Sequence, residues 1–186
     1  MYLAIRLSKF AHHGAETSPD GYYGFIATFD LYGFALKHGQ GTAGAVWVAG
    51  SGVGPLSGAK TIILGWNVLP AEYGDSRAHF FTAWTDDGFI KTGCLNTKCP
   101  GFQPEKGAHI APGDAIEHVS TPNGGGEGAH IRFGGMVTAP VSDPAPMGSG
   151  YLPAAGGAAA SISNIQLIDW DVRASPVTQD LPKLES

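Results

Sequence analysis

The chain has 186 residues, of which 43% are hydrophobic and 15% are charged, so it can bury the core of one domain. Its net charge is −5 and it has no basic run, which argues against nucleic acid or an anionic membrane surface as a partner. No apolar run approaches the roughly 20 residues that a membrane-spanning helix needs.

Glycine predicts the fold class. The 28 glycines cluster at segments such as 50–54 and 124–126, where they interrupt any helix but suit turns between strands. Between the turns lie stretches rich in aromatic and β-branched residues, typical of strands. In chain order, strands are expected at 2–7, 22–32, 43–49, 60–68, 79–85, 114–119, 129–138 and 159–172. We therefore expect an antiparallel β-sandwich with little or no helix.

The first ten residues are too short, and too interrupted by Arg6 and Lys9, for a secretory signal. This leaves open whether a leader is absent or lies outside the sequence. His12 and His13 follow, in a segment expected to be an exposed loop. The sandwich is expected over 1–173, with 174–186 as a mobile C-terminal tail because it holds two prolines and scattered charges.

Alternation in two strands assigns residues to faces, because successive side chains point to opposite sides of a sheet. In 60–68, the core set is Ile62, Leu64, Trp66 and Val68, and the opposite set is Thr61, Ile63, Gly65 and Asn67. In 129–138, the core set is Ile131, Phe133 and Val137, and the opposite set is His130, Arg132, Gly134, Met136 and Thr138. Ile63 and Met136 are therefore apolar residues on otherwise polar or small faces. The alternative is that both are core residues and a bulge shifts the assignment by one.

Several motifs resemble the neprosin family. They are Tyr22-Tyr23-Gly24, Gly65-Trp66-Asn67-Val68, Tyr73-Gly74-Asp75-Ser76-Arg77, Phe81-Thr82-Ala83-Trp84-Thr85, Thr92-Gly93-Cys94-Leu95-Asn96, Cys99-Pro100-Gly101-Phe102, Phe133-Gly134-Gly135, Met147-Gly148-Ser149-Gly150 and 164–171. Their order and extent, from about Tyr2 to Val172, make the resemblance specific.

The resemblance implies a secreted β-sandwich glutamic endopeptidase that cuts after proline in acid, with two catalytic glutamates on the cleft face. In such a pair, one carboxylate takes a proton from water while the other group stabilises the developing oxyanion. One family glutamate stands two residues before the Gly-Trp pair, at Ile63 here. The other follows Phe-Gly-Gly, at Met136 here. Neither side chain can carry a proton, so the sequence predicts a shortened member that lacks both catalytic residues.

Two other departures accompany these substitutions. Ala83 stands where the family usually has tyrosine, which is expected to thin the cleft wall. The connection from Cys99 to Met136 lacks the tryptophan-rich hairpin of the family, which is expected to leave a sheet edge open for pairing with a second chain.

Cys94 and Cys99 match the family's disulfide, with two free thiols as the alternative. The bridge and the resemblance imply an extracellular location. Two cysteines and scattered histidines supply too few ligands for a metal site, and no cofactor is expected.

Two functions remain open. In the first, the chain is a non-catalytic extracellular module, self-associating or binding a peptide, a glycan or a protein in the cleft. The candidate ligand-binding residues are Thr61, Asn67, Trp84, His130 and Arg132. In the second, it is a secreted acid prolyl endopeptidase that uses displaced carboxylates, for which Glu117 and Glu127 are the candidates.

Overall fold

The structure, a computed structural model, describes residues 6–14, 22, 24–50, 60–104, 106–116, 130–140, 142–143, 145–147, 161–169, 171–177 and 183–185. Nearly all regular structure in this part of the chain is β. The strands are β1 Arg6–Gly14, β2 Gly24–Phe29, β3 Gly41–Ala49, β4 Thr61–Val68, β5 His79–Thr85, β6 Cys94–Leu95, β7 His130–Pro140, β8 Ile162–Ile168, β9 Ala174–Pro176 and β10 Lys183–Glu185, and the one short helix is α1 Pro70–Tyr73.

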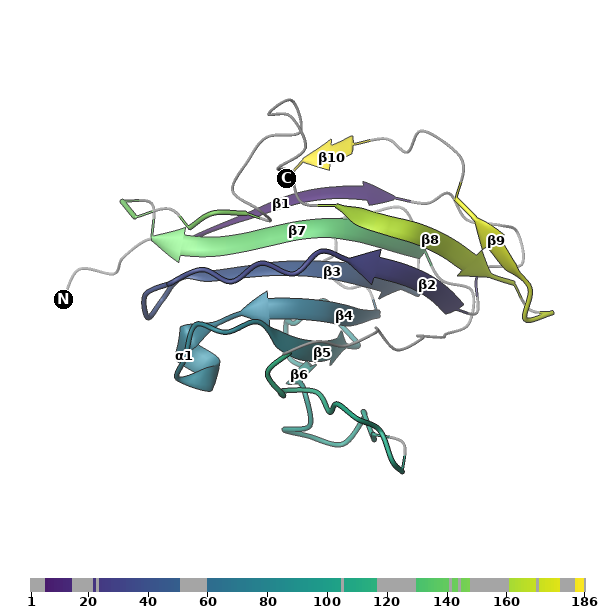
Figure 1. Cartoon of the computed structure of the whole chain (residues 1–186), viewed down its shortest axis with the longest axis horizontal. Helices are drawn as coiled ribbons and strands as arrows, with labels where there is room; N and C mark the ends of the chain where they lie inside the picture. The colour runs from purple at the N-terminus through teal and green to yellow at the C-terminus, as the bar shows by residue number, and fades with distance from the viewer. Residues whose placement is uncertain are drawn as a thin grey trace.

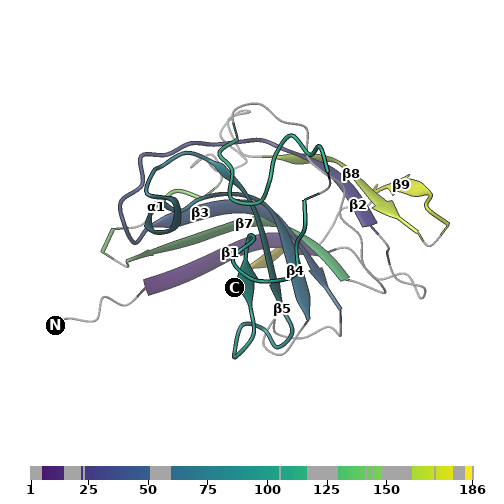
Figure 2. The same cartoon turned by 90° about the horizontal axis from the view of Figure 1, so that it is seen from below.

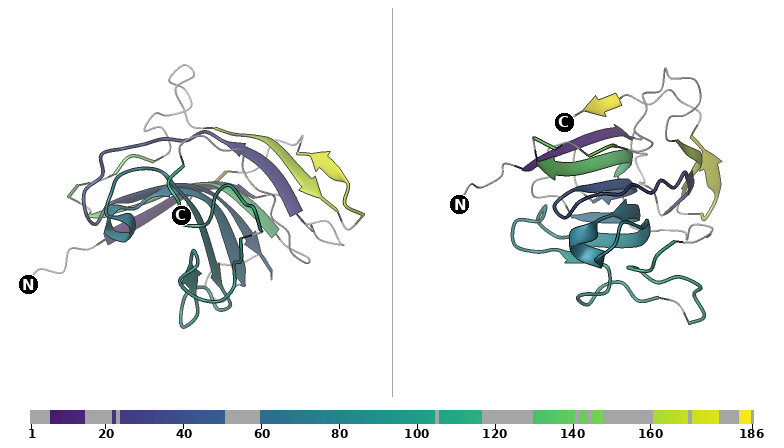
Figure 3. Two further views of the ribbon diagram at one scale, coloured as in Figure 1. Left: turned by 60° about the horizontal axis from the view of Figure 1, so that its bottom comes forward. Right: turned by 60° about the vertical axis from the view of Figure 1, so that its left-hand side comes forward.

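The strands form two antiparallel sheets. The large sheet has the order β10-β1-β7-β3-β4-β5-β6, and the small sheet has the order β2-β8-β9. Figure 1 shows β2 and β8 running across the large sheet, and the turned views of Figure 3 separate the two sheets into layers. The predicted all-β antiparallel fold is confirmed.

The main core lies between the two sheets. Val46 and Val48 of β3 pack there against Phe25 of β2 and Leu167 of β8, with Ile62 and Leu64 of β4 alongside. A second cluster, around Leu36, Trp66 and Val68, continues the core. The core set predicted for β4 is thereby confirmed. We call this side of the large sheet its inner face and the side turned away from the small sheet its outer face.

Strand β3 is central in the large sheet, and all nine of its residues are buried. At one position in β4 and one in β7, the backbone of the adjacent strand comes so close that only glycine fits. A Cβ on Gly65 would lie 2.1 Å from the carbonyl oxygen of Gly44, and one on Gly134 would lie 2.0 Å from that of Ala11. The Gly65-Trp66 motif therefore has a structural cause, since only glycine leaves room for the adjacent strand.

The amino-terminal strand differs from expectation. Residues 1–5 lie outside the described part, but β1 extends to Gly14 and pairs with β7 on one side and β10 on the other. His12 and His13 are therefore partly buried strand residues and not an exposed loop. Their pairing partners are more than 100 residues away in sequence, so local composition did not reveal the strand.

The carboxyl-terminal region also differs. Of the strand expected over 159–172, the described residues form a regular strand only in β8, because the chain turns at Asp169, whose carboxylate accepts the N–H of Arg173 at 2.9 Å. The tail then supplies β9 to the small sheet and β10 to the large one, so its described segments are part of the sandwich. Of the strand expected at 114–119, only Ala115 forms an isolated bridge, to His79, and 117–119 lie outside the described residues. No helix in the described part is long and apolar enough to cross a membrane.

Candidate functional site

The candidate site lies on the outer face of the large sheet. Figure 2 shows this sheet from below, with β1, β7, β3, β4 and β5 side by side. Antiparallel partners sit on the same face, so the register defines rows of side chains that cross the sheet.

Ile63 belongs to one such row. The row consists, from β6 to β1, of Leu95, Ala83, Ile63, Trp47, Arg132 and Gly14. Met136 belongs to another, which consists, from β5 to β1, of His79, Asn67, Ala43, Met136 and Phe10. Both positions thus lie on the outer face, opposite to the main core.

The two rows are four residues apart along β4, from Ile63 to Asn67. At strand dimensions this separates the backbones at Ile63 and Met136 by about 14 Å along the strands and about 10 Å across them. Two carboxylates that activate one water must both reach it within hydrogen-bonding distance. The register thus sets the two backbones well apart, and joint action of carboxylates at these positions on one water would depend on the reach of both side chains.

Both residues instead belong to one apolar cluster. Its buried members are Ala43, Ala45, Trp47, Phe81 and Ala83, and its partly buried members are Phe10, Ile63, Leu95 and Met136. The Trp47 ring has its centroid 6.4 Å from that of Phe10, in an edge-on arrangement. Small residues at the centre are covered by large ones around them, since Ala45 has no exposed surface. The middle of the outer face is therefore a packed apolar floor.

The other predicted site residues are distributed unevenly. Thr61 and Asn67 are buried on the outer face, Thr61 in the row next to that of Ile63 and Asn67 in the row of Met136. Positions 130 and 132 pair with Ala49 and Trp47, and so share the rows of Thr61 and Ile63.

Trp84 does not belong to this face. It pairs with Ile62 of β4 and Cys94 of β6, which puts it on the inner face of the sheet. Its indole lies against the backbone of Gly101, where a Cβ would come within 2.5 Å of Nε1. Alternation along β5 thus separates Trp84 from the other predicted ligand-binding residues, and its role in binding stays a prediction.

A polar cluster that the sequence did not reveal lies at one end of β5. The His79 ring, which is 5% exposed, is stacked on Tyr73 with a centroid distance of 3.8 Å. Its Nε2 lies 2.9 Å from Asp75 Oδ1, and its Nδ1 lies 2.8 Å from the carbonyl oxygen of Gly113. Because both ring nitrogens are occupied by oxygen partners, His79 has no free nitrogen with which to act as a base toward a substrate.

The neighbours of this cluster perturb two pKa values. Hydrogen bonds from His79 and then Arg77 hold the pKa of Asp75 well below its usual range. Burial raises the pKa of Tyr73, against the opposing effect of hydrogen bonds from Asn96 and Asn67. The Asn96 side chain donates to the Tyr73 hydroxyl at 3.2 Å. The only signal in the sequence was the Tyr73-Gly74-Asp75 motif, which gives no hint of the partner at Gly113.

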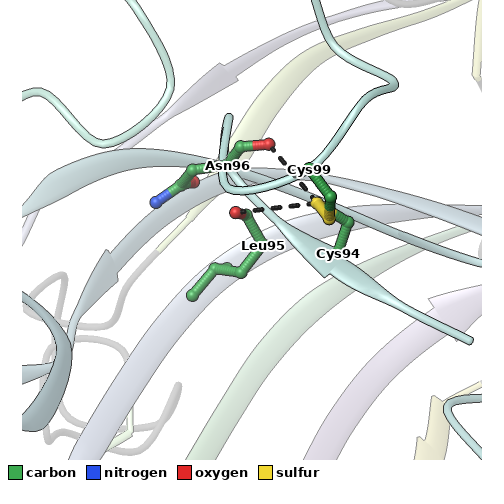
Figure 4. The surroundings of a disulfide bond; sticks show 4 residues. All are labelled: Cys94, Leu95, Asn96 and Cys99. Carbon is green, nitrogen blue, oxygen red and sulfur yellow. Dashed lines mark hydrogen bonds between the residues drawn. A yellow bond between two sulfur atoms is a disulfide. The ribbon is translucent and has the colours of Figure 1, made fainter.

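A disulfide joins Cys94 and Cys99, as the resemblance implied, with a Cα–Cα distance of 6.0 Å. Figure 4 shows it beside Leu95 and Asn96 at the end of β6. The side chain of Asn96 accepts the N–H of Thr82 at 3.1 Å, and its backbone N–H donates to the Thr82 carbonyl at 2.7 Å. The bridge therefore fixes a loop that closes the edge of β5.

Comparison with known families decides the identity. A family model described as Neprosin matches residues 38–132 and 123–186, which together cover most of the chain. The chain belongs to the neprosin family. The matched residues include Trp66, Trp84 and the two disulfide-bonded cysteines, Cys94 and Cys99.

The neprosin domain of this chain has few groups for acid–base chemistry on its outer face. Among the outer-face strand residues whose side chains are described, none is Asp or Glu, although the carboxylates of Asp75 and Asp87 contact His79 and Thr85 of this face. No group of three or more His, Cys, Asp or Glu residues in the described part could hold a metal ion. Glu117 and Glu127, the alternative carboxylates, lie outside the described residues.

Proposed function

We propose that this neprosin domain is a non-catalytic extracellular module that uses its outer face to bind an extended peptide, a glycan or a protein partner. The observation that carries the proposal is the chemistry of the two family positions: Ile63 and Met136 belong to an apolar cluster. Removing both members of a catalytic dyad leaves only binding and residual polarisation, which amounts to a loss of several powers of ten in rate.

The surroundings of Ile63 support the same conclusion. Its two lateral neighbours are Trp47 and Ala83, both almost fully buried. An active carboxylate needs hydrogen-bond donors or a defined charge to hold its pKa near the working pH. A packed apolar floor supplies neither. It favours contact with the apolar parts of a ligand, such as prolyl rings or the hydrophobic faces of sugars.

The extracellular part of the proposal rests on the Cys94–Cys99 disulfide, since such bonds form and persist in oxidising compartments. Self-association is part of the proposal, because the small sheet contains only β2, β8 and β9 in the described part of the chain. Light scattering over a range of concentrations tests it. Concentration-dependent assembly is expected, and a monomer at every concentration would remove self-association from the proposal.

The test of catalysis is a digest of a fluorogenic proline-containing peptide at about pH 3 to 5, the range in which carboxylates titrate. The wild-type chain is compared with Glu117→Gln and Glu127→Gln. We expect no cleavage by any of the three. Cleavage by wild type that is lost in either glutamine variant would establish an acid endopeptidase with displaced carboxylates, and would refute the non-catalytic proposal.

The double variant Ile63→Glu, Met136→Glu tests the geometry separately. Because the register sets the two positions four residues apart along β4, we expect the double variant to be as inert as wild type. Cleavage by the double variant alone would mean that the two positions approach each other more closely than the observed register allows.

A further inference from the structure

The polar cluster at His79 carries an inference that is independent of the proposed function. His79 is buried, yet each ring nitrogen faces an oxygen: Nε2 faces Asp75 Oδ1 at 2.9 Å, and Nδ1 faces the carbonyl oxygen of Gly113 at 2.8 Å. A neutral imidazole has one ring proton and can donate through only one nitrogen. The Gly113 carbonyl can only accept. Both interactions can be hydrogen bonds from His79 only when the ring is an imidazolium.

Asp75 is an ionised acceptor in this arrangement. Arg77 donates to it three times, through its backbone N–H to Oδ1 at 2.9 Å, through Nε to Oδ2 at 2.9 Å and through its terminal nitrogen at 2.7 Å. The hydrogen bond from His79 and then those from Arg77 hold the pKa of the Asp75 carboxyl well below its usual range. An ionised Asp75 can only accept, so the ring Nε2 is the donor of the hydrogen bond to Oδ1.

The remaining charged or titratable groups around His79 can be assigned to other partners. From α1, Tyr73 stacks on the ring, and Glu72 pairs with Lys98. From segment 111–116, the Asp114 carboxylate accepts the N–H of Ala111 at 2.8 Å. The β4 neighbour in the row of His79 is Asn67, which carries no charge. Asp75 is therefore the anion that compensates a charge on His79.

The second hydrogen bond of His79 joins β5 to a separate segment. Residues 111–116 run along the edge of β5, where Phe80 N–H donates to Asp114 O at 2.9 Å and Gly113 N–H donates to Phe80 O at 2.7 Å. Ile116 N–H donates to Ala78 O at 2.9 Å. This segment leads from the disulfide loop toward the region before β7. Among the described side chains, that of His79 contacts this segment through the carbonyl oxygen of Gly113.

We propose that His79 is a pH-sensitive latch, which in its charged form strengthens the attachment of residues 111–116 to the edge of β5 and weakens it when the ring loses a proton. With one ring proton, the imidazole can donate a hydrogen bond either to Asp75 or to the Gly113 carbonyl. At the other contact, the lone pairs of the ring nitrogen and the oxygen repel each other. The domain edge beside the disulfide is therefore closed in acid and looser at neutral to alkaline pH. A protein that meets compartments of different acidity would expose this segment in only one of them.

Amide hydrogen exchange tests the latch at about pH 5 and about pH 8, on the two sides of neutrality. The reporters are the amides of Phe80, Gly113 and Ile116, and Val46 in the core is the reference. After correction for intrinsic exchange, we expect protection of the reporters to fall by about one to two powers of ten at the higher pH, because the hydrogen bond that breaks is donated by a charged group. Val46 keeps its protection.

Two variants make the test specific. His79→Gln removes the titrating ring and should give equal reporter protection at both pH values. His38→Gln replaces an exposed histidine remote in sequence from the latch and should keep the wild-type pH dependence. Ring ¹⁵N spectra of wild type should show protons on both His79 nitrogens at about pH 5.

Some results would overturn the latch. One is equal protection of the reporter amides at both pH values in wild type. This result does not depend on whether any variant folds. Another is the wild-type pH dependence persisting in His79→Gln. A third is a His79 nitrogen without a proton at about pH 5 while Gly113 and Ile116 remain protected.

Discussion

The substitution Ile63→Glu asks whether the outer face can still accept a carboxylate. Ile63 is partly buried and packs in a cluster whose nearest row neighbours are Trp47 and Ala83. None of the described outer-face side chains offers a positive charge at this point. We expect the variant to fold but to be less stable than wild type, and increasingly so as the pH rises.

The magnitude has two parts. Full burial of an isoleucine side chain contributes about 1.5 to 3 kcal/mol, and Ile63 is only partly buried, so its removal costs about 1 to 2 kcal/mol. The introduced carboxyl adds a cost that depends on pH, because apolar surroundings raise its pKa in the folded state. Each unit by which the pKa of this carboxyl differs between the folded and unfolded states adds about 1.4 kcal/mol to the destabilisation. At pH 7 we expect a total destabilisation of about 2 to 4 kcal/mol.

The sign of the pH effect follows from proton linkage. A raised folded pKa means that the folded state binds more protons, so stability falls as the pH rises through the ordinary glutamate value of about 4.3 and levels off above the folded pKa. Urea unfolding at about pH 4 and pH 7 measures it, with Ile63→Gln as the neutral control of the same size. If the free energies of unfolding of the two variants differ by the same amount at both pH values, hydrogen-bond donors near residue 63 accommodate a carboxylate. The description of this face as an apolar floor would then be wrong.

Three further predictions follow from the fold and the polar cluster. Asp75→Asn removes a carboxylate whose pKa is lowered in the folded state, so the variant should be less stable than wild type above about pH 4 and equally stable in stronger acid. Thermal unfolding of both proteins against pH measures this, and a difference in stability that persists in strong acid would contradict it. Replacing Cys94 and Cys99 by alanine should cost about 2 kcal/mol, because the closed loop is short; urea curves with and without reductant measure this, and no effect of reductant on wild type would contradict it. Gly65→Ala should cost more than about 3 kcal/mol or prevent folding, whereas Gly33→Ala, which meets nothing within 4 Å, should change stability by less than about 0.5 kcal/mol; equal costs would contradict the close approach.

The sequence predicted the central strands well because their pattern is periodic. Alternation in 60–68 assigned Ile62 and Leu64 to the core, and the structure places both there. The strands near one edge of the large sheet were predicted less well. Strand β1 pairs with β7 and with the edge strand β10, and pairing over such a sequence distance leaves no local period.

The candidate site was predictable in part. Parity put Ile63 and Met136 on one face, and the strand pairing gives the same result. Parity contains no information on register between strands that are not neighbours in sequence, so the four-residue offset was not predictable. The hydrogen bond between His79 and Gly113 was missed for the same reason, since a loop carbonyl 34 residues away has no sequence signature.

The most direct test of the central claim is the acid digest of a proline-containing peptide by the pure wild-type chain, with Glu117→Gln and Glu127→Gln beside it. If the outer face has lost its catalytic groups, wild type releases no product above the level of the buffer at about pH 3 to 5. Product that appears with wild type and disappears in either glutamine variant would show a working carboxylate, and would contradict the account of this chain as a non-catalytic neprosin domain.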